Sequence, residues 1–262
     1  MNILNKIQEK LVVKWFRRKL TKAAIIEGKR LRLAENGYIF HNSNLKVNFY
    51  VPNYETDLIQ QIIVTEKTYY EHDELRHLLS EYDNGIVGMN IRDNCVLDIG
   101  SNIGNHSLYF LFECGARKIH CFEPMPQVFA ILKKNLEINN VEDKVVLHNV
   151  AVGAVSTKAE LLLFEKKNLG ASQFGYNDNG DYPVVAIDDL NLSDNIKFVK
   201  IDVEGFEFEV LKGMMKTIES HRPYMMIEIR SDNFENIINL LSPIGYTCSH
   251  IGGINYLFIP NK

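Results

Sequence analysis

The residues best suited to chemistry lie around Asp98, which follows the apolar run 95–97 in a chain of 262 residues. The motif reads D-x-G-x-x-x-G, with glycines at Gly100 and Gly104, and an apolar stretch at 107–112 follows it. A strand, a glycine-containing loop and a helix in this order form a ligand crevice at the carboxyl ends of the strands of an open α/β sheet. Glycine lets the backbone approach a ligand where a Cβ would collide with it. We therefore expect a ligand at this loop.

The spacing of the loop glycines disfavours a dinucleotide. Pyrophosphate-binding loops have the pattern G-x-G-x-x-G, whereas here an acid precedes the first glycine and the second glycine comes later. S-adenosylmethionine (SAM) has no phosphate but carries a sulfonium cation, an ammonium group and a carboxylate. An acid beside the loop could serve the cationic groups, and free backbone amides could serve the carboxylate. The loop residues predicted to bind this cofactor are Asp98, Gly100, Ser101, Asn102, Gly104 and Asn105.

Two further strand ends supply candidate contacts to a nucleoside. Glu123 ends an apolar strand 23 residues after Gly100, where an acid binds the ribose diol in nucleoside sites. The alternative is a surface carboxylate at a helix start. The end of the next strand should lie near adenine, where an amide gives polar contacts and small apolar side chains form a wall, although a simple strand-to-turn transition is the alternative. The predicted contacts are Glu123, Pro124, Asn149, Val150 and Ala151.

Acids after the fourth predicted strand are candidates for catalysis. Asp202 and Glu204 stand at alternate positions beyond an apolar stretch. We expect one of them to hold or deprotonate an acceptor hydroxyl, and Asp202 also to contact the cofactor. Neutralisation of a helix dipole is the alternative for Glu204. His106, just past the glycine loop, is the rival base, and a local hydrogen bond in a first helical turn is its equally weighted alternative.

The elements that would position these residues alternate between strand and helix from residue 95 onward, which argues for a parallel sheet. We expect strands at 118–123, 145–150, 197–202 and 224–228, and helices at 126–140, 206–220 and 233–242. Segments 246–250 and 255–259 flank two glycines and predict a closing antiparallel hairpin. Between the third and fourth strands, 161–164 and 183–187 are strand candidates, and 168–182 is expected to be a polar loop that shapes the choice of acceptor.

The N-terminal part differs from the remainder in charge. Its first 30 residues carry nine basic and two acidic residues, and the remaining chain carries 20 basic and 31 acidic ones. Residues 3–20 predict an amphipathic helix with a cationic side. We favour packing of this helix on its own domain or on a second subunit, so an oligomer is allowed; peripheral contact with an anionic membrane surface is the alternative. Short strands are expected at 30–52, outside the main sheet, followed by helices at 56–64 and 69–82.

Composition excludes several classes of protein. A hydrophobic content of 46% with 24% charged residues is typical of a globular domain, and neither a membrane-spanning run nor a signal-peptide pattern is visible. The four cysteines form no CxxC pair, which favours buried free thiols in a cytoplasmic protein, with any membrane contact at the inner face of the cytoplasmic membrane. The acidic body disfavours nucleic acid as a substrate.

In combination, these motifs resemble the FkbM family of class I SAM-dependent methyltransferases. The resemblance rests on V-L-D-I-G-S-N-I-G at 96–104, F-E-P at 122–124, N-V-A-V-G at 149–153, I-D-D-L at 187–190 and K-I-D-V-E-G-F-E at 200–207. In addition, Y-Y-E at 69–71 resembles an F-Y-E element that precedes the fold in that family. Ser101 and Phe206 each stand where alanine is commoner. The match covers roughly 65–260.

This resemblance implies a Rossmann-like α/β fold with seven strands, the last one antiparallel, and helices on both faces. Residues 1–64 would form an N-terminal helical and small β extension, and 65–262 the methyltransferase domain. It also implies O-methylation, frequently of a sugar hydroxyl in a glycan or a glycosylated metabolite. A non-sugar small molecule is the alternative acceptor.

Three further expectations complete the sequence-based hypothesis. No metal site is predicted, because the spacing of Asp188, Asp189, Asp202, Glu204 and Glu228 does not require one. A nucleotide-dependent oxidoreductase is disfavoured by the missing G-x-G-x-x-G; tight dinucleotide binding without SAM binding would reverse this choice. A non-catalytic nucleoside-binding protein is weakly disfavoured by acids at several strand ends, and a methyl-transfer assay would separate it.

Overall fold

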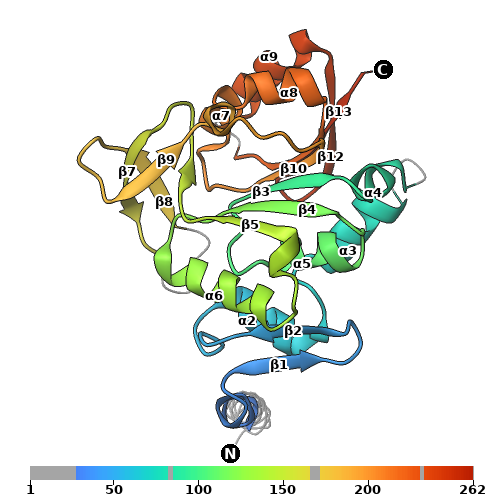
Figure 1. Ribbon diagram of the computed structural model, residues 1–262, viewed down its shortest axis with the longest axis vertical. Coiled ribbons are helices and arrows are strands. Elements are labelled where there is room, and N and C mark those ends of the chain that lie inside the picture. The colour runs from blue at the N-terminus through green and yellow to red at the C-terminus, as the bar shows by residue number, and fades with distance from the viewer. Residues whose placement is uncertain (1–27, 82–84, 166–171, 231–232, 262) are drawn as a thin grey trace, which may run out of the picture.

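The computed structural model describes residues 28–81, 85–165, 172–230 and 233–261, and its centre is a seven-stranded sheet (Figure 1). The strand order is β12-β13-β11-β10-β3-β4-β5. Strand β13 is antiparallel to both its neighbours, and the other pairs are parallel. The strands are β3 (Cys95–Ile99), β4 (Lys118–Phe122), β5 (Val145–His148), β10 (Ile196–Ile201), β11 (Tyr224–Glu228), β12 (Tyr246–Gly252) and β13 (Asn255–Pro260). The predicted sheet and its reversed last strand are confirmed.

Helices cover both faces of this sheet, as predicted. One layer contains α4 (Ile86–Ile91), α5 (Asn105–Phe112) and α6 (Pro126–Glu137); the other contains α7 (Glu207–Lys212), α8 (Met215–His221) and α9 (Phe234–Leu241) (Figure 1). Alternate residues of β3 explain the arrangement: Val96 belongs to the core with Phe110 of α5, whereas Leu97 belongs to the core with Val210 of α7. A strand that is apolar on both faces must be covered on both.

The N-terminal part packs into the same core as the α5 and α6 layer. Val47, Phe49 and Ile63 share that core with Tyr69 and Leu108, so it continues across the predicted boundary at residue 64. Its elements are β1 (Ile39–Asn42), β2 (Val47–Tyr50), α2 (Leu58–Ile62), η1 (Ile63–Lys67), α3 (His72–Arg76) and η2 (His77–Glu81). The hairpin β1-β2 lies outside the main sheet, as predicted, but 28–35 is helical where strands were expected from residue 30. The predicted helix 3–20 lies outside the described residues.

A second sheet of four strands stands beside the carboxyl end of β5 (Figure 1). Its order is β6-β9-β7-β8, with β6 (Ala151–Val152), β7 (Thr157–Leu163), β8 (Gln173–Tyr176) and β9 (Tyr182–Val185). The predicted loop 168–182 is therefore wrong at β8. This strand forms by pairing with β7, a contact that local polarity does not reveal.

Close backbone contacts at two glycines shape the helices. The predicted helix 206–220 is divided into α7 and α8 at Gly213, whose ideal Cβ would lie 1.9 Å from the carbonyl oxygen of Gly153. Helix α4 was not predicted, and Gly88 within it packs against the backbone of Leu79. Short turns η4 (Glu142–Lys144), η6 (Ile187–Leu190) and η7 (Ser242–Ile244) complete the fold. Across the described part of the chain, we find no helix that is both long and apolar enough to cross a bilayer.

Candidate cofactor and acceptor site

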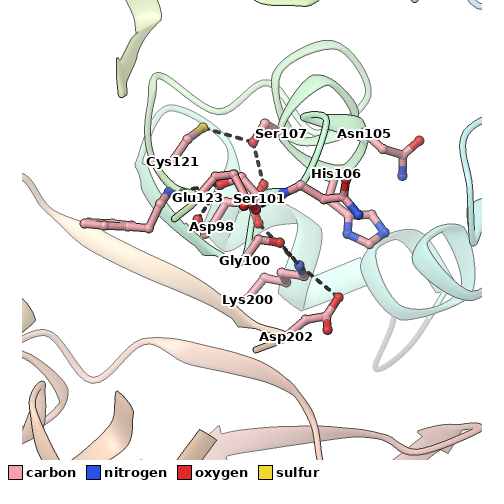
Figure 2. Close-up of polar contacts among 12 residues, drawn as sticks. Asp98, Gly100, Ser101, Asn105, His106, Ser107, Cys121, Glu123, Lys200 and Asp202 are labelled. Carbon is pink, nitrogen blue, oxygen red and sulfur yellow. Dashed lines mark hydrogen bonds and ion pairs between the residues drawn. The ribbon is translucent and has the colours of Figure 1, made fainter. Parts of the chain in front are cut away.

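Lys200 lies beneath the glycine loop and balances two acids (Figure 2). Its Nζ atom is 3.2 Å from Asp202 Oδ2 and 3.7 Å from Asp98 Oδ1, and it donates a hydrogen bond of 2.7 Å to the carbonyl oxygen of Gly100. Burial by itself would lower the pKa of Lys200, but Asp202 and Asp98 raise it above its usual value. Lys200 opens the K-I-D-V-E-G-F-E motif but has no role in the sequence-based hypothesis; the signal for its role is a lysine inside the apolar strand β10.

Asp98 and Ser101 fix the loop from below. Asp98 is fully buried at the end of β3 and accepts a hydrogen bond from the hydroxyl of Ser107 on α5. The Ser101 hydroxyl donates to the carbonyl oxygen of Asp98 (2.6 Å) and accepts from the backbone amide of Phe122 (3.0 Å). The Asp98 carboxylate thus lies in the floor of the loop, where it holds Lys200 and Ser107, and it does not line the cavities described below.

Gly100 allows the loop to pass directly over strand β10. Its φ is +79°, and an ideal Cβ would lie 1.8 Å from the carbonyl oxygen of Asp202. Gly104 has a φ of +84° and faces Leu132 of α6 at 2.6 Å from its ideal Cβ. Close approach to backbone requires glycine at position 100, whereas the positive φ favours glycine at position 104; Gly100 also lines both cavities of the site.

Glu123 follows β4 and holds two backbone amides. Its Oε2 accepts from the amide of Asn102 (3.1 Å) and its Oε1 from the amide of Met125 (2.9 Å). Burial raises the pKa of Glu123 to about 7, against the opposing effect of these two amides. The Asn149 side chain donates to the carbonyl oxygens of Glu123 (2.8 Å) and Pro124 (3.2 Å) and so fixes this turn.

A largely apolar cavity with about 530 Å³ of empty space opens above the strand ends. It lies between the main sheet and the small one, because its lining includes Ile99 and Phe122 from β3 and β4 as well as Val152 and Phe174 from β6 and β8. The lining comprises Ile99, Gly100, Phe122, Glu123, Pro124, Met125, Val150, Ala151, Val152, Ser172, Phe174, Asp202, Val203 and Phe206. Of the predicted cofactor contacts, Gly100, Glu123, Pro124, Val150, Ala151 and Asp202 meet here.

A second cavity, of about 460 Å³, is lined mainly by acids. Its walls are Ile59, Tyr70, Glu71, Gly100, Asn102, Glu123, Asp202, Glu204 and Glu228. The two cavities share Gly100, Glu123 and Asp202, so they adjoin at the end of β3 and β10.

Three carboxylates gather in the acidic cavity. Oxygens of Asp202, Glu204 and Glu228 all lie within 4.8 Å of one another. Burial, the charge of Asp202 and a hydrogen bond to it raise the pKa of Glu228 to about 9. Burial opposes ionisation of Asp202, but Lys200 and the hydrogen bond with Glu228 hold its pKa below the usual value. Glu204 is ion-paired with Arg230 and has a left-handed backbone, with φ +56°. The sequence analysis named Glu228 only as a possible metal ligand.

His106 and Asn105 serve the N-terminal segment that closes this cavity. The Asn105 side chain accepts from the Tyr70 amide (2.9 Å) and donates to the Tyr70 carbonyl oxygen (3.1 Å). His106 Nε2 lies 3.4 Å from Glu71 Oε2. Neither Asn105 nor His106 is among the described residues that line the two cavities, whereas Tyr70 and Glu71 line the acidic one. The sequence signal for these two was the Y-Y-E motif.

Among the residues that the structure describes, two groups of side chains could offer oxygen, nitrogen or sulfur to a metal ion. One is the Asp202, Glu204 and Glu228 cluster, and the other is Cys95, His120 and Asp194 at the opposite ends of the strands. Asp194 already lies 2.9 Å from Lys118 Nζ and 3.0 Å from His120 Nε2, so cationic and histidine partners occupy its carboxylate. The absence of a metal requirement stays a prediction.

Comparison with known proteins places this geometry in a family. The methyltransferase FkbM domain matches residues 98–248, which is more than half of the chain. The chain belongs to the FkbM methyltransferase family. This assignment confirms the resemblance inferred from the sequence motifs. Every motif has residues within the matched segment except Y-Y-E at 69–71, which precedes it.

Relatives of this FkbM-family protein match it over different shares of their own lengths. Hexuronic acid methyltransferase AglP of Haloferax volcanii is 27% identical over 193 residues, covering 71% of this chain and 73% of AglP. Methyltransferase 1 of Beauveria bassiana is 25% identical over 147 residues, covering 47% and 59%. The crystal structure of an FkbM methyltransferase from Methylobacillus flagellatus shares the fold, with a TM-score of 0.50 at 20% identity, covering 76% and 52%. The chain thus spans little more than half the length of the latter two proteins.

Proposed function

We propose that this protein is a SAM-dependent O-methyltransferase whose acceptor is a sugar hydroxyl of a glycan or a glycosylated metabolite. The observation that carries the proposal is the junction of an apolar cavity with an acidic one at Gly100, Glu123 and Asp202. A molecule that joins an uncharged adenosine to a cationic tail matches these two environments, whereas a dinucleotide would bring a pyrophosphate to the acidic one.

The residues present suit each part of SAM. Phe122, Val150 and Phe174 would enclose the adenine, and Glu123 would accept hydrogen bonds from the ribose diol with the lone pairs that the two backbone amides leave free. Gly100 and Asn102, which line the acidic cavity, would lie along the methionine end. Ser101 and Asp98 would act from below by holding the loop.

The acceptor would bind in the acidic cavity. When bound, SAM supplies an electrophilic methyl group on a sulfonium centre. Tyr70, Glu71 and Glu204 form the wall that would orient the acceptor hydroxyl, and Asp202 lies at the border with the cofactor. Positioning and exclusion of water are the main demands of such a displacement. His106 would support Glu71 from behind rather than meet the hydroxyl directly.

A sugar is favoured as acceptor by the relative AglP, whose name states that it acts on a hexuronic acid. The polar walls of the acidic cavity supply several hydrogen-bond acceptors for hydroxyl groups. A non-sugar hydroxyl compound is the second candidate, since the same acceptors would serve it.

The proposal is tested by measuring SAM binding calorimetrically and then incubating the protein with isotopically labelled SAM and a panel of neutral glycosides. We expect SAM binding and label on a sugar oxygen. A D202N variant should retain the fold but lose most of the transfer. Binding of NAD in place of SAM, or SAM binding with no transfer to any hydroxyl compound, would contradict the proposal.

A further inference from the structure

Glu228 lies in the acidic cavity without an ion-pair partner of its own among the described cationic residues. It ends β11 directly beside the end of β10, because Ile227 is in register with Ile201. Asp202 is therefore its lateral neighbour, and oxygens of the two carboxyl groups lie within 4.8 Å of each other. Two carboxyl groups this close repel each other when both are ionised, which favours a proton on one of them.

The surrounding charges decide which group holds that proton. Lys200 is 3.2 Å from Asp202 and favours its ionised form. Arg230 forms an ion pair with Glu204 and so neutralises the charge of that carboxylate. Glu228 is left with the proton, and its pKa of about 9 agrees with this assignment. The other ionisable groups around it on the packed elements are Tyr70, Glu71, His106 and Glu123, and they add at most one cation.

We propose that Glu228 is the proton acceptor of methyl transfer and that it becomes ionised when the positive charge of the cofactor enters the cavity. This role rests on the proposed function. The sulfonium cation beside two carboxyl groups would favour loss of the Glu228 proton, because the added charge offsets the repulsion that keeps Glu228 neutral. The residue would thus be a base only in the complex that can react.

The charges balance through the reaction. The bond between the methyl carbon and sulfur breaks with both electrons remaining on sulfur, and a bond between the acceptor oxygen and the methyl carbon forms. The hydroxyl proton passes to the Glu228 carboxylate. Before the step the cavity holds one cation and one additional anion; afterwards the sulfur and Glu228 are both neutral, so no net charge is left buried.

The proposal is tested by proton release on binding. Calorimetric titrations at about pH 8 in buffers of different ionisation enthalpy give the protons released by SAM and by S-adenosylhomocysteine (SAH), whose sulfur is uncharged. We expect SAM to release nearly one proton more than SAH. This difference should disappear in E228Q and persist in E219Q, which changes an exposed glutamate on α8. In addition, kcat of E228Q should fall by about 100-fold.

Wild-type protein provides a check that does not depend on folding of the variant. The extra proton released by SAM should diminish as pH rises through about 9, because free Glu228 is then already ionised. Equal proton release for SAM and SAH in the wild-type protein, or an unchanged difference in folded E228Q, would overturn the role of Glu228 while leaving methyl transfer itself intact. Failure of both compounds to bind would instead remove the proposed function, and this role with it.

Discussion

At the scale of single residues, backbone atoms and side chains hold the site together. Lys200 joins Asp98, Gly100 and Asp202, which come from two neighbouring strand ends and the loop between strand and helix. The Asn105 amide connects α5 to the backbone of Tyr70, 35 residues earlier in the chain. These buried contacts fix where the acids of the cavity stand, so their effects can be tested one residue at a time.

The collision at Gly100 makes the first prediction. In G100A, the new Cβ would meet the carbonyl oxygen of Asp202, and the positive φ would add strain. We expect a loss of unfolding free energy of more than about 1 kcal/mol and a loss of SAH binding, measured by urea denaturation and calorimetry. G37A is the matched control, since Gly37 has a φ of +61° but no atom within 4 Å of its ideal Cβ. Equal effects of the two substitutions would argue against close approach as the reason for glycine.

The raised pKa of Glu123 predicts a pH-dependent affinity for the nucleoside. The ionised carboxylate accepts hydrogen bonds from a ribose diol better than the neutral acid does, and the pKa of about 7 sets the range. SAH affinity should therefore increase as pH rises through about 7, and E123Q should lose roughly tenfold in affinity together with this dependence. E160Q, an exposed change on β7, should bind SAH as the wild-type protein does. The same pH dependence in E123Q would assign it to another group.

At the scale of elements, strands β4 and β5 carry a stacked histidine pair, of which His120 is buried and His148 partly exposed. His120 and His148 stack, with 3.1 Å between His120 Nδ1 and His148 Nε2, and Phe122 stacks on His148. Burial and the neighbouring His120 lower the pKa of His148 to about 4. Protonation would place a charge in this stack, which the folded state resists.

Acid should therefore loosen this edge of the sheet. The pKa of His148 in the folded protein lies below its value of about 6.5 in the unfolded chain. The neutral ring therefore contributes its full stabilisation of the folded state above about pH 6.5, and this contribution is lost as the pH falls toward about 4. We expect the free energy of unfolding to fall by about 1 to 2 kcal/mol, a value that allows for the partial exposure of the His148 ring. Urea denaturation at several pH values measures it. H148Q should flatten the dependence, whereas H250Q, at an exposed position on β12, should leave it unchanged; a flat wild-type profile would contradict the prediction.

At the scale of the whole molecule, the acidic cavity forms only where three parts of the chain meet. Tyr70 and Glu71 come from the N-terminal part, Gly100 and Asn102 from the glycine loop, and the remaining acids from the ends of β4, β10 and β11. The small sheet closes the apolar cavity from the other side through Ser172 and Phe174. The N-terminal part and the small sheet thus complete a site that the main sheet only begins.

The charge of the completed cavity predicts the acceptor. Its acids outnumber the cations beside it, Lys200 and Arg230, which are already paired. A hexuronic acid would bring another negative charge, so a neutral hexoside should be methylated with a kcat/KM at least roughly tenfold higher. The product should be an ether that survives mild alkali. Added salt should reduce the difference in kcat/KM between the neutral hexoside and the hexuronic acid. A preference for the hexuronic acid, with an alkali-labile ester as product, would contradict this prediction.

The sequence by itself determined the sheet and which strand-end residues line the candidate site, because both depend on local patterns. Buried parallel strands are apolar runs, and residues at their carboxyl ends must share one edge, so Gly100, Glu123 and Asp202 could be placed together without coordinates. The tertiary structure alone decided which acids face the cavity and which lie beneath it. Asp98 and Asp202 each follow an apolar run, yet Asp98 is enclosed by Ser107 and Lys200 whereas Asp202 meets Glu228. Pairing of β8 with β7 and the Asn105 contact to Tyr70 likewise join segments distant in the chain, and such contacts leave no periodic signal in a single sequence.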